Sequence, residues 1–189
     1  MKVSKKADII IVGAGLQGCS TALQLALKKK KVLIFDKYTA GRHASGVNAG
    51  GVRRLYRTIE EIPLSVAAQE IWPHMDQLVG SDCGFRTCGQ IKLAENEADM
   101  RVLEKRAKLV YSLGYDHERL IDGSGVRKMV PAAQSHCPGG LVSLEDGSAQ
   151  PYITTRAFRS KALELGVEFL ENHPVTAIEH TGDHIQVTG

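Results

Sequence analysis

Apolar residues near the start of the chain follow a strand pattern, then a helical pattern, then a strand pattern again. Ile9–Val12 is a short β-branched run of the kind found in strands that are buried on both faces. After a glycine-rich turn, apolar residues recur at helical spacing, and the members of this stripe are Leu16, Cys19, Leu23, Ala26 and Leu27. Val32–Phe35 is a second apolar run. The pattern therefore predicts a strand, a helix with one buried face and a second strand.

The turn between the first strand and the helix carries three glycines in the spacing G-x-G-x-x-G. Gly13 would permit the tight turn, Gly15 would let a pyrophosphate approach the backbone, and Gly18 would let the helix pack closely on the sheet. Asp36 ends the second strand 18 residues after Gly18. An acid roughly 20 residues after the glycines accepts the ribose hydroxyls in such sites. The order of strand, glycine turn, helix, second strand and acid predicts a dinucleotide site. The acid disfavours NADP because a carboxylate repels a 2′-phosphate. NAD and FAD both remain open on these residues alone.

The middle of the chain has a less regular pattern. Residues 37–58 are rich in Gly, Ser, Asn and Arg and predict a long loop. Residues 60–79 predict a helix that Pro73 interrupts. The apolar face expected for this helix consists of Leu64, Ala67, Ile71, Met75 and Leu78.

The second half of the chain alternates strands and helices. A strand is predicted at 89–94, a helix at 97–113, loops with one short strand at 131–147, and a helix at 154–165. Short strands follow at 167–170, 175–179 and 184–187, the last two joined by a turn at Gly182-Asp183. We therefore expect an α/β nucleotide-binding domain that a different block interrupts.

The composition excludes several classes of function but indicates no particular chemistry. The chain has 189 residues, which fits one domain or one domain and part of another. A net charge of +3 is too small to indicate nucleic-acid binding, and no apolar run approaches the roughly 20 residues that span a membrane. The four cysteines fit no zinc spacing, so no metal site is expected, and the chain is expected in the cytoplasm with free thiols.

Residues 44–54 favour a flavin over NAD. They resemble the second flavin-contact segment of the FAD-dependent D-amino-acid oxidase superfamily, which includes glycine oxidase and the sarcosine oxidases, and the branch like the sarcosine oxidase beta subunit is the nearest. Residues 89–93 resemble the first strand of the family's substrate domain, and residues 145–151 resemble the turn that returns the chain to the FAD domain. The resemblance implies a Rossmann-like FAD-binding domain of the glutathione-reductase type, interrupted by the start of an α+β substrate domain. Its first FAD segment would be 1–82, the partial substrate domain 83–146, and the second FAD segment 147–189.

The resemblance also implies which residues contact FAD. Short polar groups on Ser45 and Asn48 would bond phosphate or ring heteroatoms, and the bare backbone at Gly50 and Gly51 would lie against a planar ring. The family pattern brings the backbone of Val175 to the adenine. The expected cofactor-binding residues are Gly13, Ala14, Gly15, Leu16, Gln17, Gly18, Asp36, Lys37, Arg42, Ser45, Asn48, Ala49, Gly50, Gly51 and Val175.

The substrate side of the site is less well defined. The resemblance puts an arginine at the end of the second flavin segment, close to the substrate carboxylate. Arg53 is the candidate, with Arg54 and Arg57 close by in the sequence. No catalytic residue is assigned, and His43 is interpreted as an ordinary loop histidine.

The implied activity is oxidation of the C–N bond of an amino acid or an N-substituted glycine. A hydride would pass to the flavin N5 and leave an imine. The alternatives are an FAD-dependent dehydrogenase of the 2-hydroxyacid or glycerol-3-phosphate type, and a catalytically inactive dinucleotide-binding remnant. The expected partners are a small amino acid or amine substrate and, if the protein is like sarcosine oxidase, further subunits.

The resemblance further implies that the chain is the N-terminal portion of a longer enzyme. Members of the family continue into the rest of the substrate domain and return with a third glycine-rich segment. A chain of this length alone would leave sheet and domain faces uncovered, so we expect it to be unstable or prone to aggregation.

Overall fold

The computed structural model describes residues 5–189, so the first four residues of the predicted 1–82 segment lie outside the described residues. The contacts between residues divide the chain into two compact units. Unit 1 consists of Met1–Gly50, Met75–Gly84 and Gln150–Gly189, and unit 2 of Gly51–His74 and Phe85–Ala149. The predicted division at residues 82/83 and 146/147 into FAD-binding and substrate segments stays a prediction.

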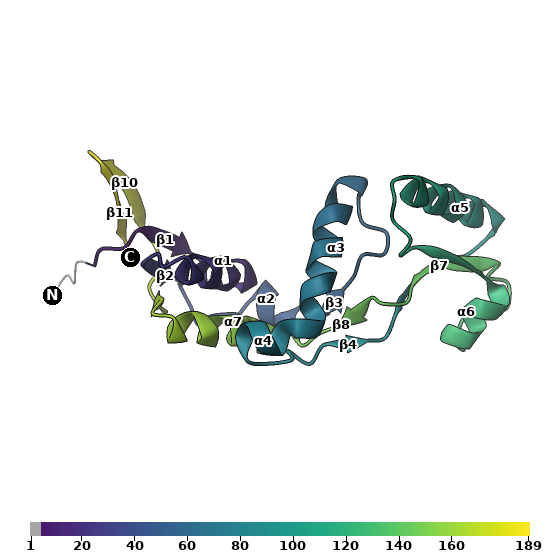
Figure 1. Cartoon of the computed structure of the whole chain (residues 1–189), viewed down its shortest axis with the longest axis horizontal. Helices are drawn as coiled ribbons and strands as arrows, with labels where there is room; N and C mark the ends of the chain where they lie inside the picture. The colour runs from purple at the N-terminus through teal and green to yellow at the C-terminus, as the bar shows by residue number, and fades with distance from the viewer. Residues whose placement is uncertain (1–4) are drawn as a thin grey trace. The chain divides into compact units, whose positions relative to one another are not determined.

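Unit 1 contains a three-stranded parallel sheet in the order β1-β2-β9. Strand β1 (Ile9–Val12) pairs with β2 (Val32–Phe35) from Ile9 opposite Val32 onward, and β9 (Glu168–Leu170) pairs with the other edge of β2. Helix α1 (Leu16–Leu27) connects the first two strands (Figure 1). The predicted strand–helix–strand order is confirmed.

The core of unit 1 lies around α1 and β2. Cys19, Ala22, Leu23 and Ala26 of α1 are buried, and every residue of β2 is buried. Helix α7 (Pro151–Glu164) packs beside α1, as Figure 1 shows, and the short helices α2 (Ala44–Val47) and α4 (Met75–Val79) contact α7. Helix α7 begins earlier than the predicted residue 154 because proline is well suited to the first turn of a helix.

Three details of the prediction for unit 1 are wrong. Strand β1 is not buried on both faces: it is an edge strand of the sheet, and Val12 is 57% exposed. Leu27, at the end of α1, is also exposed. The hairpin of β10 (Ala177–Thr181) and β11 (His184–Thr188) starts later than predicted, so Val175 precedes the strand instead of lying in it.

Unit 2 contains two antiparallel sheets. A small one has the order β3-β8-β4, formed by Gly51–Val52, Gly147–Ser148 and Arg86–Thr87. A larger one has the order β5-β7-β6, formed by Gln90–Ala94, Gly139–Ser143 and Arg119–Asp122.

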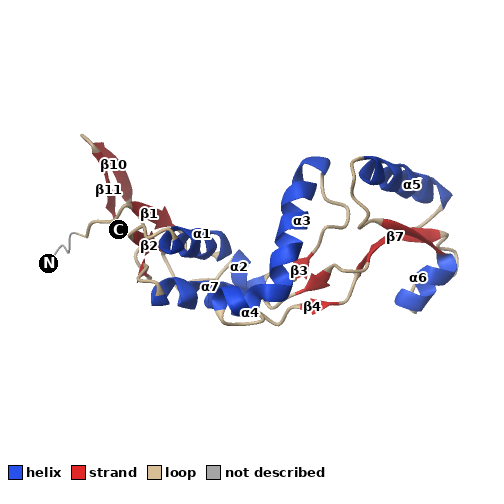
Figure 2. Cartoon of the chain, in the orientation of Figure 1, coloured by secondary structure: helices blue, strands red, loops and turns tan. Residues whose placement is uncertain are grey.

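The central strand of the larger sheet, β7, is fully buried. Helices α5 (Glu97–Ser112) and α6 (Gly123–Met129) pack against it (Figure 2). The apolar core beside this sheet joins Leu55, Ala94, Leu103 and Leu141. Unit 2 therefore has a core of its own.

The segment predicted as one interrupted helix is broken where expected. Helix α3 (Ile62–Ile71) passes into a 3₁₀ turn, Trp72–His74, that contains Pro73, and α4 follows. The predicted apolar face is wrong for α3, because Leu64 is 76% exposed and Ile71 is exposed as well, whereas Ile62 is buried. No helix among residues 5–189 combines the length and the apolar composition needed to cross a membrane.

Candidate functional site

The backbone of the turn after β1 favours glycine at Gly13 and Gly18. Gly13 has a φ of +108°, a conformation that L side chains rarely adopt. A Cβ on Gly18 would lie 1.9 Å from the carbonyl oxygen of Gly13, and a Cβ on Gly15 would lie 2.8 Å from Ser45 Oγ. The backbone geometry therefore requires Gly13 and Gly18, whereas a Cβ on Gly15 would meet only the Ser45 hydroxyl.

Asp36 is brought to this turn by the pairing of β1 with β2. The amide of Ala14 donates to Asp36 Oδ2 at 2.6 Å, and the amide of Tyr38 donates to Asp36 Oδ1 at 2.8 Å. The Gly13 amide donates to the Phe35 carbonyl at 2.7 Å. The carboxylate thus joins the glycine turn to the end of the second strand.

A second glycine turn repeats the geometry of the first. Gly41 has a φ of +73°, and a Cβ on Gly46 would lie 2.0 Å from the Gly41 carbonyl oxygen. The Gly41 amide donates to the Ala14 carbonyl at 3.1 Å, which joins the two turns. Helix α2 follows this turn, as α1 follows the first.

Ser45 of α2 connects the two turns with α7. Its Oγ accepts a bond from the Leu16 amide at 3.0 Å, and its carbonyl accepts one from Thr155 Oγ1 at 3.1 Å. Asn48 has a local role: its Nδ2 donates to the Ala44 carbonyl at 2.9 Å, and its Oδ1 accepts from the Gly50 amide at 2.8 Å. Asn48 therefore ends α2 and shapes the loop before β3.

The predicted cations gather around one ring. Lys37 Nζ lies 5.3 Å from the centroid of Tyr38, and Arg42 Cζ lies 5.2 Å from the same centroid. The segment before Val175 also reaches this region, because the Asn172 amide donates to the Tyr38 carbonyl and the His173 amide to the Asp36 carbonyl. Val175 itself is half-buried two residues further along.

Unit 1 thus brings together most of the predicted cofactor-binding residues. The residues that share a connected set of bonds and ring contacts are Gly13 to Leu16, Asp36, Lys37, Arg42 and Ser45, and Gln17 and Gly18 follow directly on α1. Asn48, Ala49 and Gly50 follow on the loop after α2. Gly51 and Arg53 belong to unit 2 and are described there.

The arginines after β3 differ sharply in what they contact. Arg54 is buried, and its guanidinium bonds Glu145 Oε2 at 2.7 Å and Asp146 Oδ1 at 3.3 Å. The Arg57 Nε donates to the Arg53 carbonyl at 3.3 Å. The side chain of Arg53 is exposed. Because Arg54 is held by two carboxylates, Arg53 is the better candidate of this adjacent pair for binding a ligand.

A buried ionic network in unit 2 was missed by the sequence analysis. Arg106 binds Glu118 through two bonds of 2.9 and 3.0 Å, and Asp146 is fully buried beside Arg54. His117 is buried between these groups, and its Nε2 has no hydrogen-bond partner among the described residues. Burial lowers the pKa of His117, and the Arg54 guanidinium lowers it further, while Glu118 and Asp146 oppose these effects. The sequence offers little sign of this burial, because Glu118 lies between His117 and Arg119 and Asp146 lies between Glu145 and Gly147.

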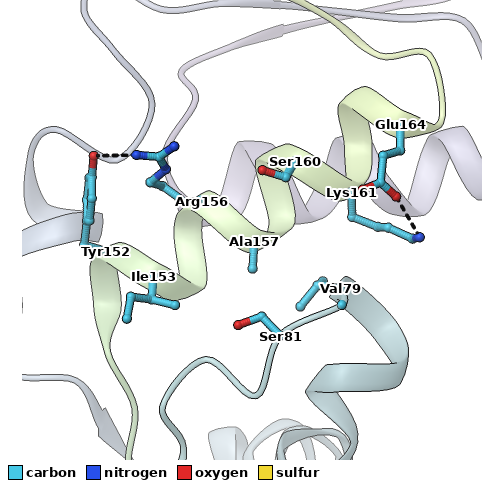
Figure 3. Close-up of a pocket in the computed structure, with 10 residues that line it drawn as sticks. Val79, Ser81, Tyr152, Ile153, Arg156, Ala157, Ser160, Lys161 and Glu164 are labelled. Atoms are coloured by element: carbon cyan, nitrogen blue, oxygen red, sulfur yellow. Dashed lines mark hydrogen bonds and ion pairs between the residues drawn. The ribbon is translucent and has the colours of Figure 1, made fainter.

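Unit 1 also has an open groove of about 490 Å³ between α4 and α7 (Figure 3). Its lining includes Val79 and Ser81 on one side and Ile153 and Ala157 on the other. Two charged groups at its wall are already paired, since Arg156 bonds the Tyr152 hydroxyl at 3.4 Å and Lys161 bonds Glu164 at 2.9 Å. None of its lining residues is a predicted site residue.

The residues at the glycine turn fit the pyrophosphate and ribose of a dinucleotide. The first turn of α1 holds no acidic residue, and although the Leu16 amide bonds Ser45 Oγ, the Gln17 and Gly18 amides precede the first helical bond, from the Cys19 amide to the Gly15 carbonyl, so the positive end of the helix dipole favours an anion. Glycine at position 15 leaves the backbone beside Ser45 uncovered, and Asp36 supplies a carboxylate at the neighbouring strand end. No cluster of metal-ligating side chains occurs in the described part of the chain.

The cysteines are free thiols, as expected. Cys19, Cys83 and Cys137 are buried, and Cys88 is exposed. Burial raises the pKa of Cys19 to about 12, with Arg159 opposing the shift. Burial also raises the pKa of Cys83. Neither Cys19 nor Cys83 is therefore suited to nucleophilic chemistry.

Comparison with known proteins gives one family. The model of the family DAO, described as FAD dependent oxidoreductase, matches residues 8–189. The chain is 26% identical to the sarcosine oxidase subunit beta of Rhodobacter capsulatus over 188 residues, which cover 96% of the chain and 45% of the relative. It is 26% identical to the glycine oxidase of Bacillus licheniformis, over 97% of the chain and 50% of the relative.

A solved structure supports the same fold. The glycine oxidase from Bacillus cereus matches with a TM-score of 0.81 and 25% identity, over 94% of this chain and 49% of that chain. The predicted fold class is thereby confirmed. The chain spans about half the length of the curated relatives it matches.

Proposed function

The chain belongs to the DAO family of FAD-dependent oxidoreductases, and from this we propose that it binds FAD at the glycine turn of unit 1 and takes part in the oxidation of an amino acid or an N-substituted glycine at its C–N bond. The single observation that supports this most strongly is the bond between the Ala14 amide and Asp36, since it joins the two parts of a dinucleotide site.

Several of the predicted residues have a definite task in this proposal. The amides at the start of α1 bind the pyrophosphate, and Asp36 accepts the ribose hydroxyls while its bond to Ala14 holds the turn in shape. Ser45 holds the second glycine turn against the first. Lys37 and Arg42 supply positive charge near the phosphates.

The substrate is bound by its carboxylate in this proposal. The exposed guanidinium of Arg53 would form a charge-assisted pair with it. When bound, FAD would supply a hydride acceptor at N5, so that loss of a hydride from the α-carbon and of a proton from the amine would convert the C–N bond to an imine for water to hydrolyse. The protein's part is to hold the carboxylate, and with it the α-carbon, in a fixed orientation.

The proposal also assigns a function to each of the three predicted segments. Segments 1–82 and 147–189 would form the FAD-binding part and 83–146 the beginning of a substrate domain. Similarity to a protein named as a subunit supports a further proposal, that this chain also acts together with other subunits. A cytoplasmic location stays a prediction.

Anaerobic reduction of the FAD-loaded protein tests the proposed reaction. The protein is mixed with sarcosine, glycine, D-amino acids, 2-hydroxyglutarate and glycerol 3-phosphate, and the loss of flavin absorbance is followed. Bleaching by an amino compound supports the proposal. Bleaching only by a hydroxy compound would replace C–N oxidation with C–O oxidation, and FAD binding without bleaching by any of them would favour the inactive remnant.

A further inference from the structure

We propose that Asp146 and Glu118 are positioning residues for Arg53, because these two buried carboxylates bind the three consecutive backbone amides that follow it. The inference rests on the proposed role of Arg53 in binding the substrate carboxylate. All the residues concerned belong to unit 2.

Asp146 binds the first two of these amides. Its Oδ2 accepts from the Arg54 amide at 2.8 Å and from the Leu55 amide at 2.8 Å. The same side chain accepts from Arg54 Nε at 3.3 Å through Oδ1. Asp146 is 92 residues from Arg54 in the sequence, so these bonds are tertiary and not a feature of a local turn.

Glu118 binds the third amide. Its Oε1 accepts from the Tyr56 amide at 2.7 Å, and both of its oxygens accept bonds from the Arg106 guanidinium. Its side chain is fully buried, as is that of Asp146. A buried carboxylate is costly unless it is paired and hydrogen-bonded, and here both conditions are met for each acid.

The backbone in this loop is held in a conformation that needs such support. Tyr56 has a φ of +56°, which is unfavourable for a residue with a bulky side chain. Its ring lies between two cations, with Lys92 Nζ at 4.4 Å and Arg106 Cζ at 5.4 Å from the centroid. The loop is thus fixed at its amides and at its one aromatic side chain.

Arg53 stands directly before the bound amides. The nitrogen of Arg54 is part of the same peptide plane as the Arg53 carbonyl and Cα, so fixing it restrains the atom from which the Arg53 side chain leaves the backbone. The Arg53 carbonyl itself accepts from Arg57 Nε at 3.3 Å. A displacement of about 1 Å in a substrate-positioning group can cost about 100-fold in rate, so these acids would matter without touching a ligand.

A double-mutant cycle separates positioning from general stability. The FAD-loaded protein is titrated with acetate as the carboxylate probe and acetamide as its neutral control, and flavin absorption reports binding. We expect Arg53→Ala and Asp146→Asn each to raise the Kd of acetate roughly tenfold, as loss of one charge-assisted contact would. In the Arg53→Ala background, Asp146→Asn should change the Kd less than about twofold, because the group it positions is already gone.

The matched control is Ser143→Ala. Ser143 is fully buried in β7 of the same unit and its hydroxyl has no partner among the described residues, so this variant perturbs the core without touching the loop. We expect it to leave acetate binding unchanged.

Amide hydrogen exchange by NMR gives a second readout that needs no ligand. Asp146→Asn should speed exchange at Arg54 and Leu55, and Glu118→Gln should speed exchange at Tyr56, while the amides of β7 stay protected. Unchanged exchange at these amides would overturn the inference, as would an equal rise in acetate Kd in both backgrounds. If Arg53→Ala leaves the Kd of acetate unchanged, the proposed role of Arg53 is wrong, and the positioning role of the two acids is wrong as well. This outcome differs from unchanged amide exchange and from an equal rise in Kd, which contradict the positioning role alone.

Discussion

The amide of Ala14 donates a hydrogen bond to the carboxylate of Asp36 at 2.6 Å, across 22 residues of sequence. This bond connects the glycine turn with the acid that the motif predicts as the ribose acceptor. The same carboxylate also accepts the amide of Tyr38. Asp36 therefore supports the shape of the turn in addition to its proposed contact with the nucleotide.

Replacing Asp36 should weaken FAD binding through both of these roles. Asp36→Asn removes the charge and leaves one acceptor oxygen where two amides now bind. Loss of a hydrogen bond to a charged group costs about 1.5–3 kcal/mol, so we expect the Kd for FAD to rise at least about tenfold. The measurement is isothermal titration calorimetry with FAD.

Asp183→Asn is the control for that substitution, since Asp183 is exposed in the same unit at the turn between β10 and β11. It removes one negative charge without touching the glycine turn. Equal loss of affinity in the two variants would mean that only the net charge matters and would contradict the assigned role of Asp36.

Gly18→Ala should destabilise unit 1. The added Cβ would lie 1.9 Å from the Gly13 carbonyl oxygen, a distance that forces the backbone to move. Overpacking of this kind typically costs about 1–3 kcal/mol. The free energy of unfolding from urea titration, followed by far-UV circular dichroism, measures the loss.

Thr21→Ala serves as the comparison for Gly18→Ala, because Thr21 is an exposed residue of the same helix. We expect its effect on unfolding to stay within about 0.5 kcal/mol, as for most surface substitutions. A Gly18→Ala protein as stable as this control would show that the turn and α1 do not approach as closely as described.

Thiol reactivity should distinguish one cysteine from the other three. Cys88 is exposed, whereas Cys19, Cys83 and Cys137 are buried, and the pKa of Cys19 is raised to about 12. In a reaction with Ellman's reagent at pH 8, we expect one thiol to react quickly in the folded protein and four in urea. Cys88→Ser should abolish the fast phase; its persistence would contradict the burial of the other three.

The elements that the sequence predicted well are those whose pattern is local. The β1–α1–β2 unit is specified by adjacent apolar runs and by glycines whose spacing reflects steric contact within the turn itself. The break at Pro73 is likewise a property of one residue and its neighbours.

The elements that were missed depend on distant partners. Strand β6 and helix α6 are too short to show a clear periodic pattern, and β6 exists through its pairing with β7, about 20 residues further along the chain. The roles of Asp146 and Glu118 arise from tertiary bonds to residues 91 and 62 positions away, and no spacing rule in the sequence reports such bonds. The exposure of Leu64 shows the converse, that an apolar periodicity predicts a face but not what covers it.

Acid should destabilise unit 2 through His117. In the folded protein its pKa is lowered, first by burial and next by the charge of Arg54. Between the lowered pKa and the ordinary histidine pKa, the unfolded chain therefore binds a proton at His117 that the folded chain does not bind. Stability from this group is therefore complete above about pH 6.5 and is lost as the pH falls through the lowered pKa. Urea unfolding at pH 7.5 and pH 5.5, followed by the fluorescence of Trp72 in unit 2, measures the difference.

His117→Gln should reduce that pH dependence, because the side chain no longer titrates. The exposed His74, in the same unit, offers the matched substitution His74→Gln, which should leave the pH dependence as it is. An unchanged slope in His117→Gln would assign the acid sensitivity to other groups.

The most direct test of the central claim, that the glycine turn and Asp36 bind the ADP half of FAD, is a titration of the protein with FAD and with FMN under identical conditions. FMN carries the same flavin ring without the ADP half. We expect saturable binding of FAD, measured by quenching of flavin fluorescence, and at least about 100-fold weaker binding of FMN, since the pyrophosphate and ribose contacts supply much of the affinity. Equal affinity for the two flavins, or no binding of FAD, would contradict the account.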